Sequence, residues 1–106
     1  SLIIAYSPCI NHGINMSNCM LEEKLAVECG YWNLFRFAPN AQNNKFMLDS
    51  KAPKGDYVEF LKSENRFASL KRTNSENFES LFEQSKEYAN YRYNKYLQLV
   101  EMYKNL

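Results

Sequence analysis

The last third of the chain carries one long apolar stripe that neither glycine nor proline interrupts. A capping-box sequence, Thr73-Asn74-Ser75-Glu76, precedes the stripe and predicts the start of a helix, because its hydroxyl and carboxylate bond free amides of the first turn. A helix of about 30 residues is about 45 Å long, which exceeds the width of a domain this small. We therefore expect a long helix whose stripe is a packing face, with part of it packed on another body. The stripe follows steps of three and four residues: Phe78, Phe82, Ser85, Ala89, Tyr93, Tyr96, Val100 and Tyr103.

The opening of the chain predicts a buried strand. Leu2–Tyr6 is apolar without alternation, is too short for a helix, and is ended by Ser7-Pro8. Such runs are typical of strands buried on both faces of a parallel sheet. Ligands of open α/β sheets bind beyond the carboxyl ends of the strands, and Cys9 stands at that position. The sequence therefore marks Cys9 as a candidate to contact a cofactor.

The segment after this strand predicts a helix and a second strand. Met16–Cys29 has a rough helical spacing of apolar residues, with Asn15 or Ser17 as its cap and Gly30 as a left-handed stop. Tyr31–Phe37 is aromatic-rich and reads as a strand. Strand, helix and strand in this order predict a βαβ unit with a right-handed crossover, and so the α/β class. The expected apolar face of the helix consists of Met16, Met20, Leu21, Leu25 and Val27.

The middle of the chain predicts a change of organisation. Phe46–Leu48 is expected to be a short return strand, and Asp49–Gly55 a surface connection. Asp56 is a plausible cap for a helix that follows. We therefore divide the chain into a βαβ segment over 1–55 and a helical segment over 56–106 that ends in the long helix. The apolar face of the first helix in the second segment repeats through Tyr57, Phe60, Leu61, Glu64, Phe67, Ala68 and Leu70.

Composition excludes several classes of function. A net charge of +1 with interspersed acids and bases gives no electrostatic footprint for nucleic acid. No apolar run approaches the roughly 20 residues that span a bilayer, and no signal-peptide pattern is present. An odd cysteine count without close pairs indicates a reducing compartment. The chain opens at Ser1 without an initiator Met, and we expect it to be a segment of a longer protein.

The cysteines leave two interpretations open. Cys9, Cys19 and Cys29 lie ten residues apart, and with the single histidine they match no known spacing of a four-ligand cluster or zinc site. Cys9 is either an ordinary cysteine at the end of a strand or one ligand of a site whose other ligands lie elsewhere.

Several motifs, taken in their order, resemble one family. They are Ile3–Gly13 (IIAYSPCINHG), Met20–Pro39 (MLEEKLAVECGYWNLFRFAP), Leu48–Pro53 (LDSKAP) and Phe60–Leu70 (FLKSENRFASL). The chain resembles pyruvate:ferredoxin (flavodoxin) oxidoreductase over essentially its whole length. It is similar to the carboxyl-terminal part of that enzyme's thiamine-diphosphate-binding region.

The resemblance implies an enzyme that oxidatively decarboxylates pyruvate, transfers the acetyl group to coenzyme A and reduces ferredoxin or flavodoxin. It implies thiamine diphosphate with Mg²⁺, whose ligands lie outside this segment, and [4Fe–4S] clusters. In the family one cluster takes three cysteines from upstream sequence and a fourth from the SPC motif, which is Cys9 here. The backbone amides of Asn11, His12 and Gly13 are expected to tune that cluster, although His12 also fits a plain loop histidine. Cys19 and Cys29 are expected to be structural.

Two alternatives accompany this interpretation. One is a related oxidoreductase for another 2-oxo acid, since the substrate pocket is not in this segment. The other is a small helical interaction module without a cofactor that uses its tyrosine stripe. For the parent enzyme we expect a homodimer in the cytoplasm, or in an organelle such as the hydrogenosome of an anaerobic eukaryote, with no nucleic-acid or membrane partner. The segment alone is expected to be inactive.

Overall fold

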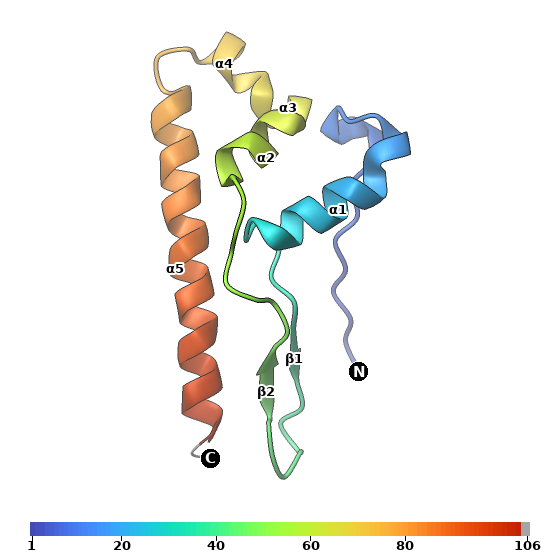
Figure 1. The fold of residues 1–106 in the computed structure, drawn as a ribbon, viewed down its shortest axis with the longest axis vertical. Helices are drawn as coiled ribbons and strands as arrows, with labels where there is room; N and C mark the ends of the chain where they lie inside the picture. The colour runs from blue at the N-terminus through green and yellow to red at the C-terminus, as the bar shows by residue number, and fades with distance from the viewer. Residues whose placement is uncertain (105–106) are drawn as a thin grey trace.

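A computed structural model describes residues 1–104, and its spine is the long helix α5, Phe78–Lys104. The other elements lie along one side of this helix (Figure 1). The molecule measures 51 × 30 × 21 Å with a radius of gyration of 16.1 Å. A compact domain of this length has a radius of about 13 Å. The chain is therefore elongated along α5.

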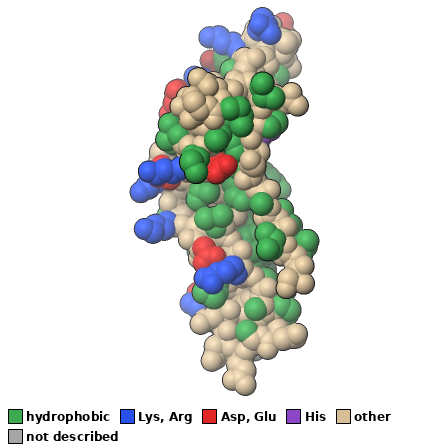
Figure 2. All heavy atoms as spheres, turned by 90° about the vertical axis from the view of Figure 1, so that its right-hand side faces the viewer, with side chains coloured by type: hydrophobic (Ala, Val, Ile, Leu, Met, Phe, Trp, Pro, Cys, Tyr) green, Lys and Arg blue, Asp and Glu red, His purple; other side chains and the backbone are tan. Residues whose placement is uncertain are grey.

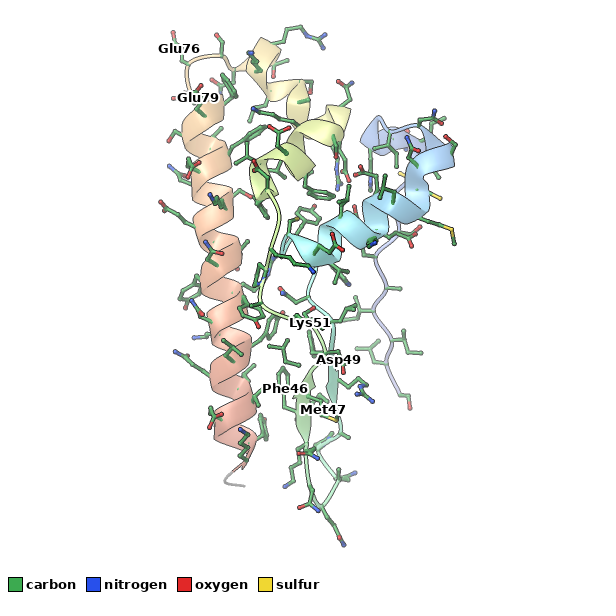
Figure 3. The ribbon with its side chains drawn as sticks, viewed as in Figure 1. Phe46, Met47, Asp49, Lys51, Glu76 and Glu79 are labelled. Carbon is green, nitrogen blue, oxygen red and sulfur yellow. The ribbon has the colours of Figure 1, made fainter. Side chains whose placement is uncertain are left out.

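The stripe on α5 is a packing face, as the sequence predicts. Its upper half packs on α2, Tyr57–Ser63, where Phe82 and Ala89 are buried and the Tyr57 hydroxyl lies 2.7 Å from Ser85 Oγ. Its lower half packs on a hairpin of the same chain. Phe46 of this hairpin faces α5, and its ring stacks on those of Tyr96 and Tyr103 with centroid distances of 6.2 and 6.4 Å (Figure 3). Tyr93, Tyr96, Val100 and Tyr103 remain only half-buried, so the expectation that part of the stripe packs on another body stays a prediction.

The predicted capping box is wrong. Thr73 is the last residue of α4, Leu70–Thr73, and its hydroxyl donates to the carbonyl of Ser69 at 3.1 Å. The turn before α5 is held instead by Asn74, whose carbonyl accepts from the amides of Asn77 and Phe78 at 3.2 and 3.1 Å. Thr73, which the sequence pattern assigned to the cap of α5, is therefore part of the preceding short helix α4.

The hairpin consists of β1, Phe35–Phe37, and β2, Phe46–Leu48, paired antiparallel with Arg36 opposite Met47. The return strand predicted at Phe46–Leu48 is confirmed. The first strand is shorter than the predicted Tyr31–Phe37. Next to the hairpin, Arg36 donates two hydrogen bonds to the carboxylate of Asp49 at 3.0 and 2.9 Å.

The predicted βαβ unit is wrong. Within residues 1–104 the sheet contains β1 and β2 alone, and Leu2–Tyr6 is not a strand. Leu2, Ile3 and Ile4 are instead 83, 88 and 70% exposed. A strand buried on both faces needs neighbouring strands and covering helices. The strand β1 pairs with β2 rather than with the opening segment, because that pairing closes only a short loop. A two-stranded sheet with helices is compatible with the α/β class, and membership of a thiamine-diphosphate-binding fold stays a prediction.

The first helical region begins with a short 3-10 helix, η2, Met16–Asn18, followed by α1, Cys19–Glu28. Asn15 caps it by accepting the amide of Ser17 at 3.1 Å, and Gly30 follows with a φ of +88°, both as predicted. The buried face differs from the expected one. Glu22, Ala26 and the following Cys29 are buried, whereas three expected apolar positions are exposed to solvent. Those three are Met16, Met20 and Leu21.

The helix after Asp56 is shorter than predicted. Asp56 caps α2 as expected, because its carboxylate accepts the amide of Glu59 at 3.1 Å. At Glu64 the backbone is extended, with φ −108° and ψ 121°, and α3, Asn65–Ala68, begins in a new direction. The core joins residues of both predicted segments, so 1–55 and 56–106 pack together, and the division between them stays a prediction. In the described part of the chain, no helix is both long and apolar enough to cross a membrane.

Candidate functional site

Cys9 stands at the start of a tight turn that follows the extended opening segment. Its backbone is extended, with φ −141° and ψ 172°, and the 3-10 helix η1, Ile10–His12, begins directly after it. The thiol is free and the residue is exposed, whereas the preceding Pro8 is buried. We call residues 9–13 the Cys9 loop. This loop holds its thiol at the surface, where groups from outside the chain can reach it.

The backbone of the Cys9 loop is bonded to itself. The amide of His12 donates to the carbonyl of Cys9 at 2.9 Å, and the amide of Gly13 donates to the carbonyl of Ile10 at 3.0 Å. These two amides serve the turn in this structure, so hydrogen bonds from them to cluster sulfurs stay a prediction, as does the role of Asn11. The turn itself fixes the direction in which the Cys9 side chain leaves the backbone.

Gly13 ends the turn in a conformation that glycine adopts readily. Its φ is +74°, in the left-handed region. A Cβ at this position would overlap the Cβ of Asn65, the first residue of α3. Both the backbone angle and this close approach require glycine. The Cys9 loop is thus packed directly against the start of α3.

Glu64 connects this loop with the interior. Its side chain is fully buried, and its carboxylate accepts the Tyr6 hydroxyl at 3.2 Å and Arg66 Nε at 2.6 Å. The Nδ1 atom of His12 lies 3.7 Å from the same carboxylate and, among the described residues, has no hydrogen-bond partner. Burial, followed by the adjacent Glu64 carboxylate, raises the pKa of Tyr6, so its phenol stays a hydrogen-bond donor.

A second buried carboxylate lies beside the first. Glu22 of α1 is 6% exposed, and the hydroxyl of Ser63 lies 3.0 and 3.1 Å from its two oxygens. Burial is the main cause that raises the pKa of Glu22, and the neighbouring carboxylate of Glu64 adds to it, against a lowering by Ser63. The two glutamates therefore form a buried acidic pair between α1, the end of α2 and the Cys9 loop.

The other two cysteines lie outside the Cys9 loop and are less exposed than Cys9. Cys29 is 8% exposed, belongs to the hydrophobic core, and its thiol lies 3.7 Å from the carbonyl of Ala26. Burial raises the pKa of the Cys29 thiol, which disfavours the thiolate that metals bind. Cys19 is half-buried at the first turn of α1. Both placements agree with a structural role.

A metal site at Cys9 would need ligands from beyond the described residues. Over residues 1–104, no group of three or more His, Cys, Asp or Glu side chains is arranged to hold a metal ion. The donor that Cys9 offers, one free exposed thiol, fits a single corner of an iron–sulfur cluster. A complete site therefore needs three more thiolates.

Sequence reasoning missed the residues that support the Cys9 loop. Tyr6, Glu22, Ser63 and Arg66 were not assigned to the site. One signal was available for Glu64, which is the single charged residue within the predicted apolar face that runs from Tyr57 to Leu70. A charge at such a position is costly unless it is paired.

An apolar groove lies beside the opening segment. It has a volume of about 750 Å³, with Leu2, Ile3 and Ile4 on one side and residues 31–37 on the other. Arg92 and Tyr96 of α5 complete its lining. Figure 2 shows hydrophobic side chains spread over this side of the molecule, with few charges among them. The segments predicted to be neighbouring strands thus lie on opposite sides of this groove.

Comparison with known proteins defines the class of protein to which the chain is similar. No family model matches it. Over nearly its whole length, however, it matches one segment of large oxidoreductases that are named for pyruvate.

The relatives are pyruvate:ferredoxin and pyruvate-flavodoxin oxidoreductases and an NADP-dependent enzyme. The chain is 48% identical over 104 residues to the pyruvate:ferredoxin oxidoreductase of Moorella thermoacetica and 41% identical over 105 residues to the pyruvate-flavodoxin oxidoreductase of Klebsiella pneumoniae. It is 38% identical over 106 residues to the mitochondrial pyruvate dehydrogenase (NADP+) of Euglena gracilis. These matches cover 95, 94 and 95% of this chain but only 9, 9 and 6% of the relatives. The chain matches a fragment of pyruvate:ferredoxin/flavodoxin oxidoreductase, and the resemblance recognised in its sequence is confirmed.

Proposed function

We propose that this chain is part of a pyruvate:ferredoxin or pyruvate:flavodoxin oxidoreductase, in which Cys9 supplies one of four thiolate ligands of a [4Fe–4S] cluster. The observation that carries the proposal is the 48% identity over 95% of the chain to an enzyme of that name. The free, exposed thiol at the start of a rigid turn supports the assignment of Cys9. The remaining three ligands come from sequence outside this segment.

In this proposal the parent enzyme converts pyruvate and coenzyme A to acetyl-CoA and CO₂ and passes the electrons to its acceptor. Thiamine diphosphate with Mg²⁺ supplies an electron sink when bound, and residues outside this segment hold it. The contribution of this chain is local. Cys9 binds iron as a thiolate, and the turn bonds of His12 and Gly13 keep the Cys9 backbone in one conformation.

The electron acceptor is decided outside this segment. Relatives named for ferredoxin, flavodoxin and NADP+ are all 38–48% identical to the chain. All of these names contain pyruvate, which favours pyruvate over another 2-oxo acid. We place the parent enzyme, as a homodimer, in the cytoplasm or in an organelle such as a hydrogenosome.

Replacing Cys9 by alanine in the full-length protein tests the ligand assignment. Iron content and low-temperature spin resonance should show one cluster lost or converted, and reduction of the acceptor by pyruvate should collapse while decarboxylation partly survives. Cys19→Ala and Cys29→Ala are matched controls that remove a thiol elsewhere. They should keep every cluster and cost about 1 kcal/mol or less. Full cluster content and full electron transfer in Cys9→Ala would show that Cys9 is not a ligand.

A further inference from the structure

Glu64 is a fully buried carboxylate whose contacts come from separate parts of the chain. Tyr6 precedes the Cys9 loop, His12 belongs to it, and Arg66 lies in α3. A buried carboxylate is costly unless charges and hydrogen bonds compensate it. Arg66 Nε, at 2.6 Å, supplies the opposite charge. Glu64 stands at the break between α2 and α3, where its backbone is extended.

Two of these contacts stand symmetrically about Cys9. Tyr6 lies three residues before Cys9 and His12 three residues after it. The Tyr6 hydroxyl donates to Glu64 at 3.2 Å, His12 Nδ1 lies 3.7 Å from the same carboxylate, and the two rings stack at 6.4 Å. The Glu64 carboxylate therefore accepts a hydrogen bond from Tyr6 on one side of the thiol and lies near His12, without a hydrogen bond, on the other.

The residue after Glu64 makes a third connection. Asn65 packs so closely on Gly13 that no side chain fits between them. The break at Glu64 thus fixes the segment before the Cys9 loop through Tyr6 and the end of the loop through the contact of Asn65 with Gly13. Both effects depend on where α3 starts.

We propose that Glu64 is a positioning residue, which acts through its hydrogen bond from Tyr6 to hold the Cys9 thiol in the geometry that its metal cluster requires. This role rests on the proposed function, since it presumes that Cys9 is a ligand. Residues that support ligands in this way typically change metal affinity by 10- to 100-fold when they are replaced.

The test uses the full-length protein and the cluster whose spin-resonance signal disappears in Cys9→Ala. The rate at which this cluster loses iron to a chelator is compared in Glu64→Ala, Glu64→Gln and Tyr6→Phe. Asp49→Asn is the matched control, because Asp49 is also a carboxylate paired with an arginine, Arg36, but makes no contact with Glu64 or the Cys9 loop. Line shape is recorded for each variant alongside the rate.

We expect Glu64→Ala to lose iron about tenfold faster or more, with an altered line shape. Glu64→Gln should recover most of the wild-type rate, because its amide oxygen still accepts the Tyr6 hydroxyl. Tyr6→Phe should accelerate the loss, and adding it to Glu64→Ala should produce no further increase, since both changes remove the same contact. Asp49→Asn should behave as wild type.

Unchanged rates and line shapes in folded Glu64→Ala overturn the proposal. Where Glu64→Ala does not fold, an unchanged rate in Tyr6→Phe overturns it equally. Acceleration by Asp49→Asn as large as that by Tyr6→Phe also contradicts it, because the effect would then not be specific to the carboxylate beside the Cys9 loop. Loss of the cluster in Cys9→Ala together with wild-type behaviour in the Glu64 variants refutes the positioning role alone. Retention of every cluster in Cys9→Ala refutes the ligand assignment itself.

Discussion

Arg92 joins α5 to the connection between α1 and β1, and its removal should open that connection. Its guanidinium donates to the carbonyls of Gly30 and Tyr31 at 3.0 and 2.7 Å and to the side-chain oxygen of Asn33 at 3.2 Å. Gly30 and Asn33 are buried. Arginine and alanine both favour helices, so Arg92→Ala removes these contacts without weakening α5 itself.

The structure sets the size of the effect. Hydrogen bonds to a charged group contribute about 1.5–3 kcal/mol each, so an upper limit for three such bonds is roughly 4.5–9 kcal/mol. Arg92 also lines the apolar groove, where water can reach the freed carbonyls and offset part of the loss. We therefore expect Arg92→Ala to cost about 2–4 kcal/mol. Arg92→Lys should recover only part of this, because an ammonium lacks the planar fork that reaches several acceptors at once.

Hydrogen exchange measured by mass spectrometry on the full-length protein provides the assay. At tenfold per 1.4 kcal/mol, peptides covering residues 30–33 and the facing turns of α5 should exchange roughly 30- to 700-fold faster in Arg92→Ala. Lys86→Ala, an exposed position on the same helix, is the control and should exchange as wild type. Exchange within threefold of wild type in Arg92→Ala would refute the view that this fork anchors α5.

Three further predictions follow from the packing and the electrostatics. Ala89 is buried near the centre of α5, so Ala89→Pro should cost about 3 kcal/mol or more and lower the melting temperature of the full-length protein. The cluster spectra of the folded fraction should stay unchanged. Selective loss of the cluster at full stability would contradict a packing role for α5. The pKa of Glu22 is raised from its ordinary value near 4.5, so the carboxyl group of Glu22 keeps its proton to higher pH in the folded than in the unfolded protein. The stability that this group contributes is complete below the ordinary pKa and is lost as the pH rises through the folded pKa. Glu22→Gln should therefore flatten this part of a stability profile measured against pH, and an unchanged slope would count against a raised pKa. The isolated 106-residue chain, treated with iron and sulfide, should show no stable [4Fe–4S] absorption band and should self-associate through its exposed apolar residues; a monomer that assembles the cluster would overturn the ligand count.

The local sequence pattern was sufficient to predict the elements that depend only on residues close together in the chain. The stripe from Phe78 to Tyr103, the cap at Asp56 and the stop at Gly30 were all predictable, because each depends on neighbours within a few positions. Cys9 was predictable as a candidate for the same reason, since the break at Ser7-Pro8 lies beside it. The opening strand was predicted wrongly because its apolar composition specifies burial but not the strand that would pair with it.

The sequence by itself thus determined the long helix, its buried face and the position of an unpartnered thiol. Only the tertiary structure decided which residues support that thiol. Tyr6 and Glu64 are separated by 58 positions, and no periodicity relates them. Their contact exists because the chain breaks at Glu64 and α3 packs on Gly13. A helical repeat is a property of adjacent residues, whereas the partners of a buried carboxylate are set by how distant segments fold against one another.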